Sequence, residues 1–527
     1  MKKNSKAKRG FLLSAGVIFI LLLVTVKKVF DLSAAPTESK PCDFVYPPDE
    51  DPGKETALTL DAALQWEQEG GTVNDASCLN KTAVYGVVDI RTEEDALNAL
   101  NFARENGLKI SLAGQQHSMG GQSFTTGGLV LDMKNYKQMS LEGEVLTVQA
   151  GATWADVQEF LDPKGLSVKA MQSINIFTIG GTLSVNAHGI AHDPGQVGFS
   201  VKNLRVLLPS GEVVDCGPEE NAELFKNVLG GYGLFGMILE AELEVVENVE
   251  LSHEREYMDY RDFHAWYGEN INNNEEVNLF YARLSVSPFS YLEETAAHVF
   301  KTLPEEEPEV LVTEKAHTGF MRFVINFSKT GNVGRWLRWT LEKNLEPALN
   351  CSRNNAMSQP DEVCRTTRNQ SMYDSMEYLK NKLPDTDILQ EYFVEPQHFV
   401  DFVDGLREIV KKNDANLLNV TIRIVHADSL STLAYAPTDR FALVLYFNQG
   451  LNEADSKIVE QTTVELIDLA TSLGGSYYLP YQLYYSPEQL RAAYPAIDAF
   501  FAQKKELDAA ELFSNKWYQK YGQVLTK

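Results

Sequence analysis

Apolar and polar positions along the first half of the chain predict short strands and helices in close succession. Strand-like spacing of apolar residues covers 84–90, 144–150, 204–209, 212–216 and 237–246. Helix-like spacing covers 58–68, 92–106, 154–161 and 221–229. The helix over 92–106 has Thr92 as its cap and Asp95 three positions on, close to a capping box. This mixture predicts an α+β domain over residues 56–246.

The second half repeats longer strands and helices, which predicts a second α+β domain over residues 247–480. Strands are expected at 279–286, 389–394, 419–426 and 442–447, and helices at 261–269, 397–411 and 453–473. Strands and helices taking turns predict a sheet covered by helices on one face. The polar stretch 304–384 has no clear pattern. Residues 481–527 form a C-terminal segment with a helix expected at 491–501.

The N-terminus has the pattern of a targeting segment over residues 1–35. Five basic residues precede the apolar run 11–26, which Lys27 and Lys28 follow. The run is short for a bilayer span, which needs roughly 17–25 residues, although residues 29–30 extend it if the lysines snorkel. Pro36 after 33–35 disfavours cleavage, so an uncleaved membrane anchor is favoured over a removed signal. Either way the body is expected outside the cytoplasm, tethered by a linker over 36–55.

The charge of the chain argues against one class of partner, and its cysteine count limits the possible disulfides. The 73 acidic and 47 basic side chains give a net charge of −26, which disfavours nucleic acid as a partner. The five cysteines are an odd number, so at least one has no partner within the monomer. Cys351 with Cys364 is one candidate pair, and Cys42 with Cys78 is another. No cluster of cysteine and histidine predicts a metal site.

The stretch 109–132 carries the strongest sign of chemistry. Between two short apolar strands lies a loop with five glycines, at positions 114, 120, 121, 127 and 128. Successive N–H groups in such a loop form a concave nest that binds anions such as a diphosphate. His117, between Gln116 and Ser118, is a hydrogen-bonding group and a nucleophile. A hairpin with a surface histidine is the alternative, but a second glycine-rich loop at 177–189 favours a binding site.

Three short motifs in these two loops resemble the vanillyl-alcohol oxidase family. They are Gly-Xaa-Xaa-His-Ser at 114–118, Ile-Gly-Gly-Thr at 179–182 and Ala-His-Gly at 187–189. That family consists of flavoenzymes with an FAD-binding domain of the p-cresol methylhydroxylase type, and the pattern is closest to its sugar-alcohol and aldonolactone oxidase branch. The resemblance implies a two-subdomain FAD-binding domain, a cap domain for the substrate, and a C-terminal segment that returns to the FAD domain.

The resemblance also implies which residues hold FAD. In many members the loop histidine is bonded covalently to the 8α-methyl carbon of the flavin, and here that residue is His117. A histidine packed in the core is an alternative interpretation of His188. The full set of implied cofactor-binding residues is Ala113, Gly114, Gln115, Gln116, His117, Ser118, Gln122, Ser123, Gly180, Gly181, Thr182, Ser184, His188, Gly189, Gly236, Ile238 and Asn515.

A third glycine motif, at 231–236, matches the GxGxxG fingerprint of dinucleotide-binding folds. That fingerprint requires a strand before it and a helix after it. Here a helix is expected before the motif and a strand after it, so a Rossmann fold is rejected. Gly236 and Ile238 remain candidates for main-chain contacts to FAD through the family resemblance.

Candidate catalytic residues come from two strands of the second domain. The segment 421–428 is similar to a pattern of sugar-alcohol oxidising relatives, in which an acidic residue stands two positions before an arginine. Here the arginine is Arg423 and the earlier position is Thr421, which weakens the case for a polyol. Arg423 is expected to bind a substrate oxygen or the reduced flavin, the alternative being an ion pair with Glu391. Glu391 and Tyr392 lie in a second segment that resembles a strand entering the same cavity.

These features predict an FAD-dependent oxidoreductase that oxidises a CH–OH group of a polyol, sugar or related alcohol. Hydride passes to flavin N5 and then to oxygen or another electron acceptor. Reduction of a C=C bond in a lipid-like substrate is one alternative, and a catalytically idle flavin-binding surface protein is another. The identity of the substrate is not predicted.

Overall fold

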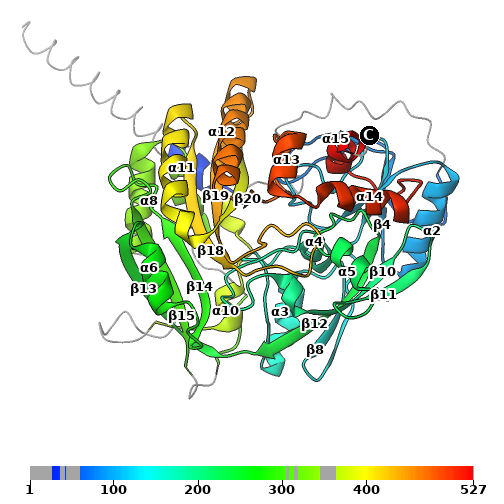
Figure 1. Ribbon diagram of the computed structural model, residues 1–527, viewed down its shortest axis with the longest axis horizontal. Coiled ribbons are helices and arrows are strands. Elements are labelled where there is room, and N and C mark those ends of the chain that lie inside the picture. The colour runs from blue at the N-terminus through cyan, green and yellow to red at the C-terminus, as the bar shows by residue number, and fades with distance from the viewer. Residues whose placement is uncertain are drawn as a thin grey trace, which may run out of the picture.

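The computed structural model describes residues 27–35, 42, 60–303, 308–313, 318–344, 364–380 and 382–525. The chain forms a mixed α+β structure in which two domains lie side by side (Figure 1): the domain expected to bind FAD, called the FAD domain here, and a large sheet domain. The predicted targeting run 11–26, most of the linker and Cys351 lie outside the described residues. Within the described part of the chain, no helix is long and apolar enough to cross a membrane.

The first subdomain is built on a small sheet with a parallel centre. Its strand order is β1 (Trp66–Glu69), β4 (Gly86–Asp89), β6 (Leu129–Asp132) and β5 (Ile110–Ala113). β4 and β5 both pair with β6 in parallel, so β6 lies between them. Between β4 and β5 the chain forms α2 (Glu93–Glu105), with the capping box of Thr92 and Asp95 in place. A two-stranded ribbon, β2 (Thr72–Val73) and β3 (Thr82–Ala83), lies beside this sheet.

The second subdomain is an antiparallel sheet with three short helices. Its strand order is β11 (Val213–Cys216), β10 (Val201–Leu207), β12 (Met237–Glu247), β8 (Val145–Gln149) and β7 (Met139–Glu142), with β9 (Leu166–Val168) also paired to β12. The helices are α3 (Trp154–Leu161), α4 (Ile179–Ser184) and α5 (Ala222–Val228). Helix α5 precedes the glycine motif at 231–236 and strand β12 follows it. This is the reverse of the Rossmann order, as the sequence predicted.

The second domain is an eight-stranded antiparallel sheet. Its order is β16 (Arg365–Thr367), β13 (Glu250–Asp259), β15 (Glu294–Thr302), β14 (Val277–Leu284), β18 (Leu417–Val425), β19 (Arg440–Gly450), β17 (Asp385–Val394) and β20 (Ser476–Tyr477). Helices α6 (Phe263–Asn270), α11 (Phe399–Asn413) and α12 (Glu453–Ser472) cover one face (Figure 1). Phe399 and Phe402 of α11 are fully buried against that face. The predicted helix-covered sheet is confirmed.

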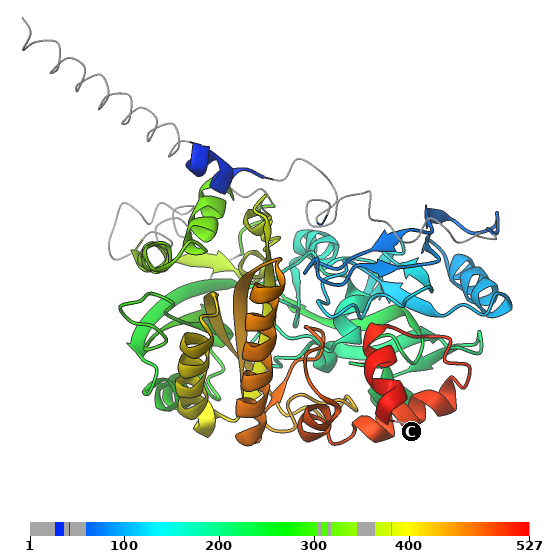
Figure 2. The same cartoon turned by 90° about the horizontal axis from the view of Figure 1, so that it is seen from above.

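The other face of the sheet is shared between the FAD domain and a helical hairpin. The hairpin consists of α7 (Thr318–Ser328) and α8 (Asn332–Asn344). Arg338 donates to the carbonyl of Leu418 at 3.0 Å, and Lys329 forms an ion pair with Asp387 at 2.7 Å. Figure 2 shows the two domains from above, with the C-terminal helices on the FAD side.

The C-terminal segment returns to the first subdomain through α13 (Pro487–Ala493), α14 (Ile497–Leu507) and α15 (Lys516–Leu525). The main-chain N–H of Ile110 donates to Leu512, and that of Ser514 donates back to the carbonyl of Ile110. The predicted single helix over 491–501 is wrong, because the chain breaks at Tyr494, before Pro495. Pro495 has no N–H with which to continue α13.

Three further expectations differ from the structure. The described part of the predicted helix over 58–68 is a turn followed by β1, because Asp61 accepts from the N–H of Ala63 and the indole of Trp66. The stretch 304–384, which had no clear pattern, contains α7, α8 and α10 (Arg368–Met372). Residues 177–189 are not all loop, because they include α4. The disulfide between Cys42 and Cys78 is confirmed, and Cys364 is also disulfide-bonded.

Candidate functional site

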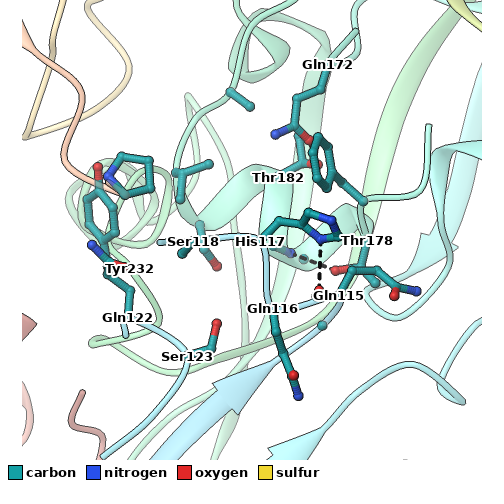
Figure 3. Close-up of a pocket in the computed structure, with 18 of the residues that line it drawn as sticks. Gln115, Gln116, His117, Ser118, Gln122, Ser123, Gln172, Thr178, Thr182 and Tyr232 are labelled. Atoms are coloured by element: carbon teal, nitrogen blue, oxygen red, sulfur yellow. Dashed lines mark hydrogen bonds between the residues drawn. The ribbon is translucent and has the colours of Figure 1, made fainter. Parts of the chain in front are cut away.

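A deep cleft opens between the FAD domain and the inner face of the large sheet. Including its open mouth, it encloses about 1320 Å³. Its walls come from four parts of the chain: the loop 112–123, the stretch 172–188, the turn 232–238, and strands β17 to β19 with residues 478–481. Figure 3 shows the side of the cleft formed by the two glycine-rich segments.

The loop after β5 presents its main-chain N–H groups to the cleft. Gln116 has a φ of 58°, which bends the chain into the left-handed region. The carbonyl of Gln116 turns outward and accepts from Ala76 at 2.9 Å. No group of the described residues accepts a hydrogen bond from the N–H of Gln115, Gln116, His117 or Ser118. Consecutive unpaired N–H groups in this geometry form a nest for an anion.

His117 lies in the wall of the cleft with its ring held in one orientation (Figure 3). Its Nδ1 donates to the carbonyl of Gln115 at 2.9 Å, and its ring packs edge-on against Phe177 at 4.9 Å between centroids. Burial lowers the pKa of His117 to about 4, and the charge of Lys380 lowers it further against the effect of the Gln115 carbonyl. The imidazole is therefore neutral at physiological pH, with its lone pair on Nε2.

The cap of helix α4 lies against the glycine loop, which explains why the loop needs glycine at position 114. Thr178 caps α4 by accepting from the N–H of Gly181 at 3.3 Å. A Cβ on Gly114 would come within 2.1 Å of Oγ1 of Thr178, so only glycine allows the loop and the helix cap to meet. Thr182 in α4 donates to Gln172 at 2.6 Å, and both side chains face the cleft.

The opposite wall carries a buried pair of a carboxylate and an imidazole. Oε1 of Glu391 on β17 lies 2.6 Å from Nε2 of His188, and their side chains are 2% and 1% exposed. Tyr481 also hydrogen-bonds to Glu391, and burial raises the pKa of Tyr481 well above its usual value. Nε of Arg423 is buried without a hydrogen-bond partner among the described residues. This wall therefore offers a ligand the carboxylate of Glu391 as an acceptor and the guanidinium of Arg423 as a donor.

Strand register explains how Glu391 and Arg423 reach the same wall. Glu391 pairs across from Val444 on β19, and Val444 pairs across from Thr421 on β18. These three residues form one row on one face of the sheet, and Arg423 follows two positions after Thr421 on that face. The alternative of an ion pair between Arg423 and Glu391 is not seen, because Glu391 pairs with His188. His188 lines the cleft in addition to being packed.

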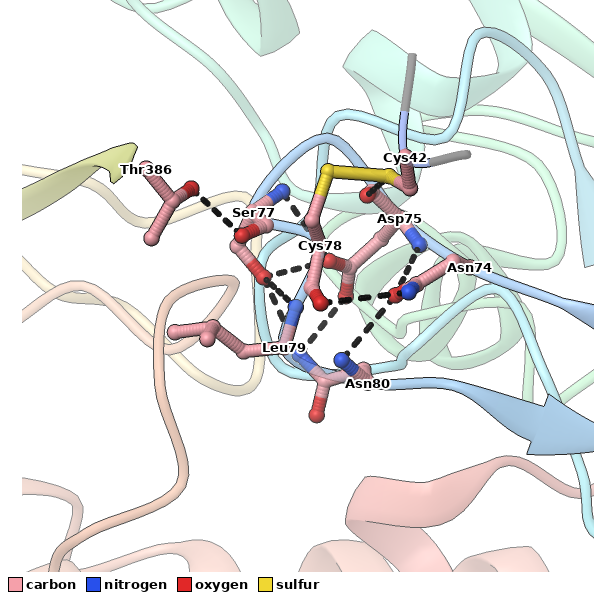
Figure 4. The surroundings of a disulfide bond; sticks show 8 residues. All are labelled: Cys42, Asn74, Asp75, Ser77, Cys78, Leu79, Asn80 and Thr386. Atoms are coloured by element: carbon pink, nitrogen blue, oxygen red, sulfur yellow. Dashed lines mark hydrogen bonds between the residues drawn. A yellow bond between two sulfur atoms is a disulfide. The ribbon is translucent and has the colours of Figure 1, made fainter. Parts of the chain in front are cut away.

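A disulfide-linked turn supports the glycine loop from behind (Figure 4). Cys78 is bonded to Cys42, and the turn it belongs to carries the buried Asp75. Oδ2 of Asp75 accepts from the N–H of Gly121 at 3.0 Å. Burial raises the pKa of Asp75 to about 6 against the effect of the donors it accepts from, which include Ser77 and Gly121. In the same turn, Ser77 accepts from Thr386 on β17, so this turn contacts both domains.

The structure brings most of the predicted residues to the cleft. Those that line it are Ala113, Gly114, Gln115, Gln116, His117, Ser118, Gln122, Ser123, Gly180, Gly181, Thr182, Ser184, His188, Ile238, Glu391 and Arg423. Tyr392 lies on the other face of the sheet, where its hydroxyl donates to Gln390 and its ring packs on Phe402.

Three other predicted residues lie behind the walls of the cleft. A Cβ on Gly189 would meet the carbonyl of Met171 at 1.8 Å, and one on Gly236 would meet that of Leu207 at 2.8 Å. Both glycines therefore serve close main-chain packing. Asn515 donates to the carbonyl of Tyr232 at 2.9 Å and reaches the cleft only through that residue.

Several lining residues were not among the predicted site residues. They are Leu112, Met133, Ala150, Gln172, Ser173, Ile174, Phe177, Thr178, Val185, Ala187, Tyr232, Gly233, Met237, Leu389, Val444, Tyr478, Pro480 and Tyr481. The aromatic run 477–485 was a visible signal for Tyr478 and Tyr481.

Comparison with known proteins shows which family the sequence of the first domain is similar to. Residues 85–217 match the sequence model of a family described as "FAD binding domain". An uncharacterized oxidoreductase of the fasciation locus of Rhodococcoides fascians is 34% identical over 161 residues, covering 30% of this chain and 37% of that protein. A putative D-arabinono-1,4-lactone oxidase of Neurospora crassa is 29% identical over 187 residues, covering 34% and 33%. Cytokinin dehydrogenase 4 of Arabidopsis thaliana is 33% identical over 147 residues, covering 26% and 28%. These matches span only about a third of the relatives' own lengths.

Proposed function

We propose that this chain is an FAD-linked oxidoreductase that oxidises a CH–OH group of a polyol, sugar or aldonolactone-like alcohol, because residues 85–217 match an FAD binding domain and a putative D-arabinono-1,4-lactone oxidase is among the similar proteins. One observation carries the proposal. The nest of N–H groups at 115–118 and the buried Glu391–His188 pair face one cleft between two domains. A small donor and an electron acceptor, oxygen or another compound, are the partners this chemistry requires.

The residues of the cleft fit FAD. Four main-chain N–H groups without protein acceptors match a diphosphate, as do the hydroxyl groups of Ser118 and Ser123. When bound, FAD supplies a hydride acceptor at its N5 atom. The fit follows from the donor set, since a nest of N–H groups binds an anion without needing a lysine or arginine.

We propose that His117 holds the flavin covalently. Nδ1 of His117 is committed to the carbonyl of Gln115, so Nε2 carries the lone pair. The pKa of about 4 keeps that nitrogen unprotonated across the physiological range, as a nucleophile must be. Phe177 holds the ring edge-on and limits its rotation.

Glu391 is assigned as the acceptor of the donor's hydroxyl proton. Oxidation of CH–OH to C=O releases one hydride and one proton, and a buried carboxylate is suited to take the proton. His188 orients that carboxylate through the 2.6 Å contact. Arg423, whose Nε has no acceptor among the residues that the structure describes, is assigned to hold the donor's oxygen.

Glu391 supplies the carboxylate that the motif lacks at position 421. The motif expects an acidic residue two positions before the arginine, and here that position is a threonine. Glu391 stands in the same row two strands away and supplies a carboxylate to the same face. This row supports a polar, hydroxyl-bearing donor over an apolar one.

We also propose that the protein is exported or membrane-anchored, with its body outside the cytoplasm. The basic residues before the apolar run 11–26 support this. The Cys42–Cys78 disulfide supports it as well, because disulfides persist mainly in oxidising compartments.

The test uses the full-length chain purified in detergent, precipitated with acid. Wild type is expected to keep its yellow colour in the pellet, and His117→Ala is expected to release it to the supernatant. His264→Ala, which removes an exposed histidine on α6, is the matched control. A colourless wild type contradicts flavin binding, and colour released from wild type contradicts the covalent bond.

A donor panel under anaerobic conditions then tests the reaction. Alditols and aldonolactones are expected to bleach the bound flavin. A reduced flavin that is reoxidised only by a C=C substrate points to a reductase instead. A flavin that no donor bleaches points to a catalytically idle binding protein.

A further inference from the structure

Exposed apolar side chains gather on one helical surface of the second domain. Thirteen large apolar residues in the described chain are exposed, and five of them lie within residues 27–33 and 318–344. They are Val29, Phe30, Phe320, Val333 and Trp336, with Phe30 70% and Val333 68% exposed. Soluble surfaces seldom gather such residues without a partner. We call the surface formed by 27–33, α7 and α8 the helical face.

The N-terminal helical segment 27–33 is docked on α7 rather than lying free (Figure 2). Leu32 is buried, and the buried Asn326 donates to its carbonyl at 2.8 Å. Arg322 donates to the carbonyl of Ser33 at 3.2 Å, and also to the carbonyl of Glu377. The chain that precedes residue 27 therefore joins the molecule at the helical face.

The length and composition of that preceding chain identify what covers the face. Residues 11–26 are a mostly apolar run without a charged residue, and basic residues stand on both sides of it. The run ends directly before Lys27, and Phe30 follows about 4.5 Å further along the helix axis. A bilayer that holds the run reaches the exposed apolar side chains beside it.

Charge on the helical face agrees with a lipid surface. The chain has 73 acidic residues, but the segments that form the helical face contain only Asp31 and Glu342. The exposed Lys27 and Lys28 also belong to this face. Repulsion between an acidic protein and anionic headgroups is smallest where the protein surface carries few acidic side chains. Trp336 and Phe320 are side chains of the kind found at the membrane–water interface.

We propose that the helical face lies on the lipid bilayer, with Phe320, Val333 and Trp336 at the level of the headgroups. The N-terminal run tethers the chain, and α7 with α8 is a second, separate lipid contact that sets the orientation of the body. Short amphipathic helices bind interfaces in this way. This goes beyond the proposed oxidation and does not depend on it, but it rests on the proposed membrane anchor.

The test reconstitutes the full-length chain into nanodiscs with brominated or unbrominated phospholipid and compares tryptophan emission. Bromine quenches tryptophans that touch lipid. The bromine-dependent quenching of Trp336→Phe is expected to be at most a third of that of wild type, because the substitution removes the exposed tryptophan of the helical face. Trp266→Phe, a partly exposed tryptophan on α6, is the matched control and is expected to retain it. Adding Phe320→Trp to Trp336→Phe is expected to restore quenching.

Three results overturn the proposal. The first is equal quenching in Trp336→Phe and wild type, which leaves only the tether in contact with lipid. The second is a chain that does not co-elute with nanodiscs. The third is protection of Trp336 by self-association in detergent without bromine quenching in nanodiscs, which assigns the face to a second copy. None of these readouts uses flavin chemistry, so failure of the proposed oxidation is recognised separately.

Discussion

Glu391→Gln separates proton transfer from simple positioning in the cleft. The substitution keeps the shape of a side chain that is 2% exposed and removes only its charge. An amide oxygen can still lie against Nε2 of His188, so the close polar contact at 2.6 Å is kept without the charge. The fold and flavin content are therefore expected to be those of wild type.

The expected size of the effect depends on the role of Glu391. A general base contributes typically 10²–10⁴-fold, so its loss lowers the rate of flavin reduction by about that factor, or about 3–5 kcal/mol. If Glu391 only holds His188 through their close polar contact, the loss is at most the difference between a charge-assisted and a neutral contact. That difference is about 1–1.5 kcal/mol, or roughly tenfold.

The assay is anaerobic stopped-flow reduction of the bound flavin by saturating donor. Tyr392→Phe, a neighbour on the same strand that faces away from the cleft, is the matched control and is expected to reduce flavin at the wild-type rate. A Glu391→Gln rate within about threefold of wild type refutes the assignment of the proton to this carboxylate. A loss near tenfold reassigns Glu391 to positioning.

Three further predictions concern the cofactor and the fold. The rate of covalent flavin attachment to refolded apoprotein is expected to stay the same from pH 8 to pH 5 and to fall below about pH 4, because protonation of His117 removes its lone pair. A histidine with an ordinary pKa near 6.5 would instead react about 30-fold more slowly at pH 5 than at pH 8. Gly114→Ala places a Cβ 2.1 Å from Oγ1 of Thr178, so flavin content per protein is expected to fall, and an unchanged content contradicts the tight contact. Replacing Cys42 and Cys78 together by serine opens a link between residues 36 positions apart and is expected to lower the free energy of unfolding in urea by about 3–4 kcal/mol, which an unshifted midpoint would contradict.

Acid is expected to weaken the fold through His117 as well. The folded pKa is about 4 and the ordinary value 6.5, so between these values the unfolded chain binds more protons than the folded one. The free energy of unfolding therefore falls as pH drops from 6.5 towards 4. His117→Gln is expected to reduce that slope in urea unfolding curves, and an identical slope would contradict the low pKa.

Local features of the sequence predicted the first domain well because they depend on neighbours in the chain. The cap of α2, the extent of α3 and the strands around the glycine loop all follow from spacing within about fifteen residues. Helix α4 was missed because glycines disfavour a helix, whereas the Thr178 cap and contact with the loop stabilise this one.

Features that depend on long-range packing were not predictable in the same way. Tyr478 and Tyr481 reach the cleft from about 360 residues after the glycine loop, held by bonds such as that from Met119 to Pro480. The strand that carries Glu391 and Tyr392 predicts that they face opposite sides, but its pattern does not tell which side meets the cofactor. Only the packing of Tyr392 under α11 decides this.

The row of Glu391, Val444 and Thr421 shows why a motif read along one strand underdescribes this site. A carboxylate two positions before Arg423 and a carboxylate two strands away in the same row present their charge to the same face. The two positions are far apart in the sequence, but both lie on the face of the sheet that carries Arg423. The double variant with Thr421→Glu and Glu391→Gln is therefore expected to be at least tenfold more active than the single variant Glu391→Gln. If the double variant stays as slow as the single one, the donor's proton depends on the contact with His188, which a residue at 421 cannot reproduce.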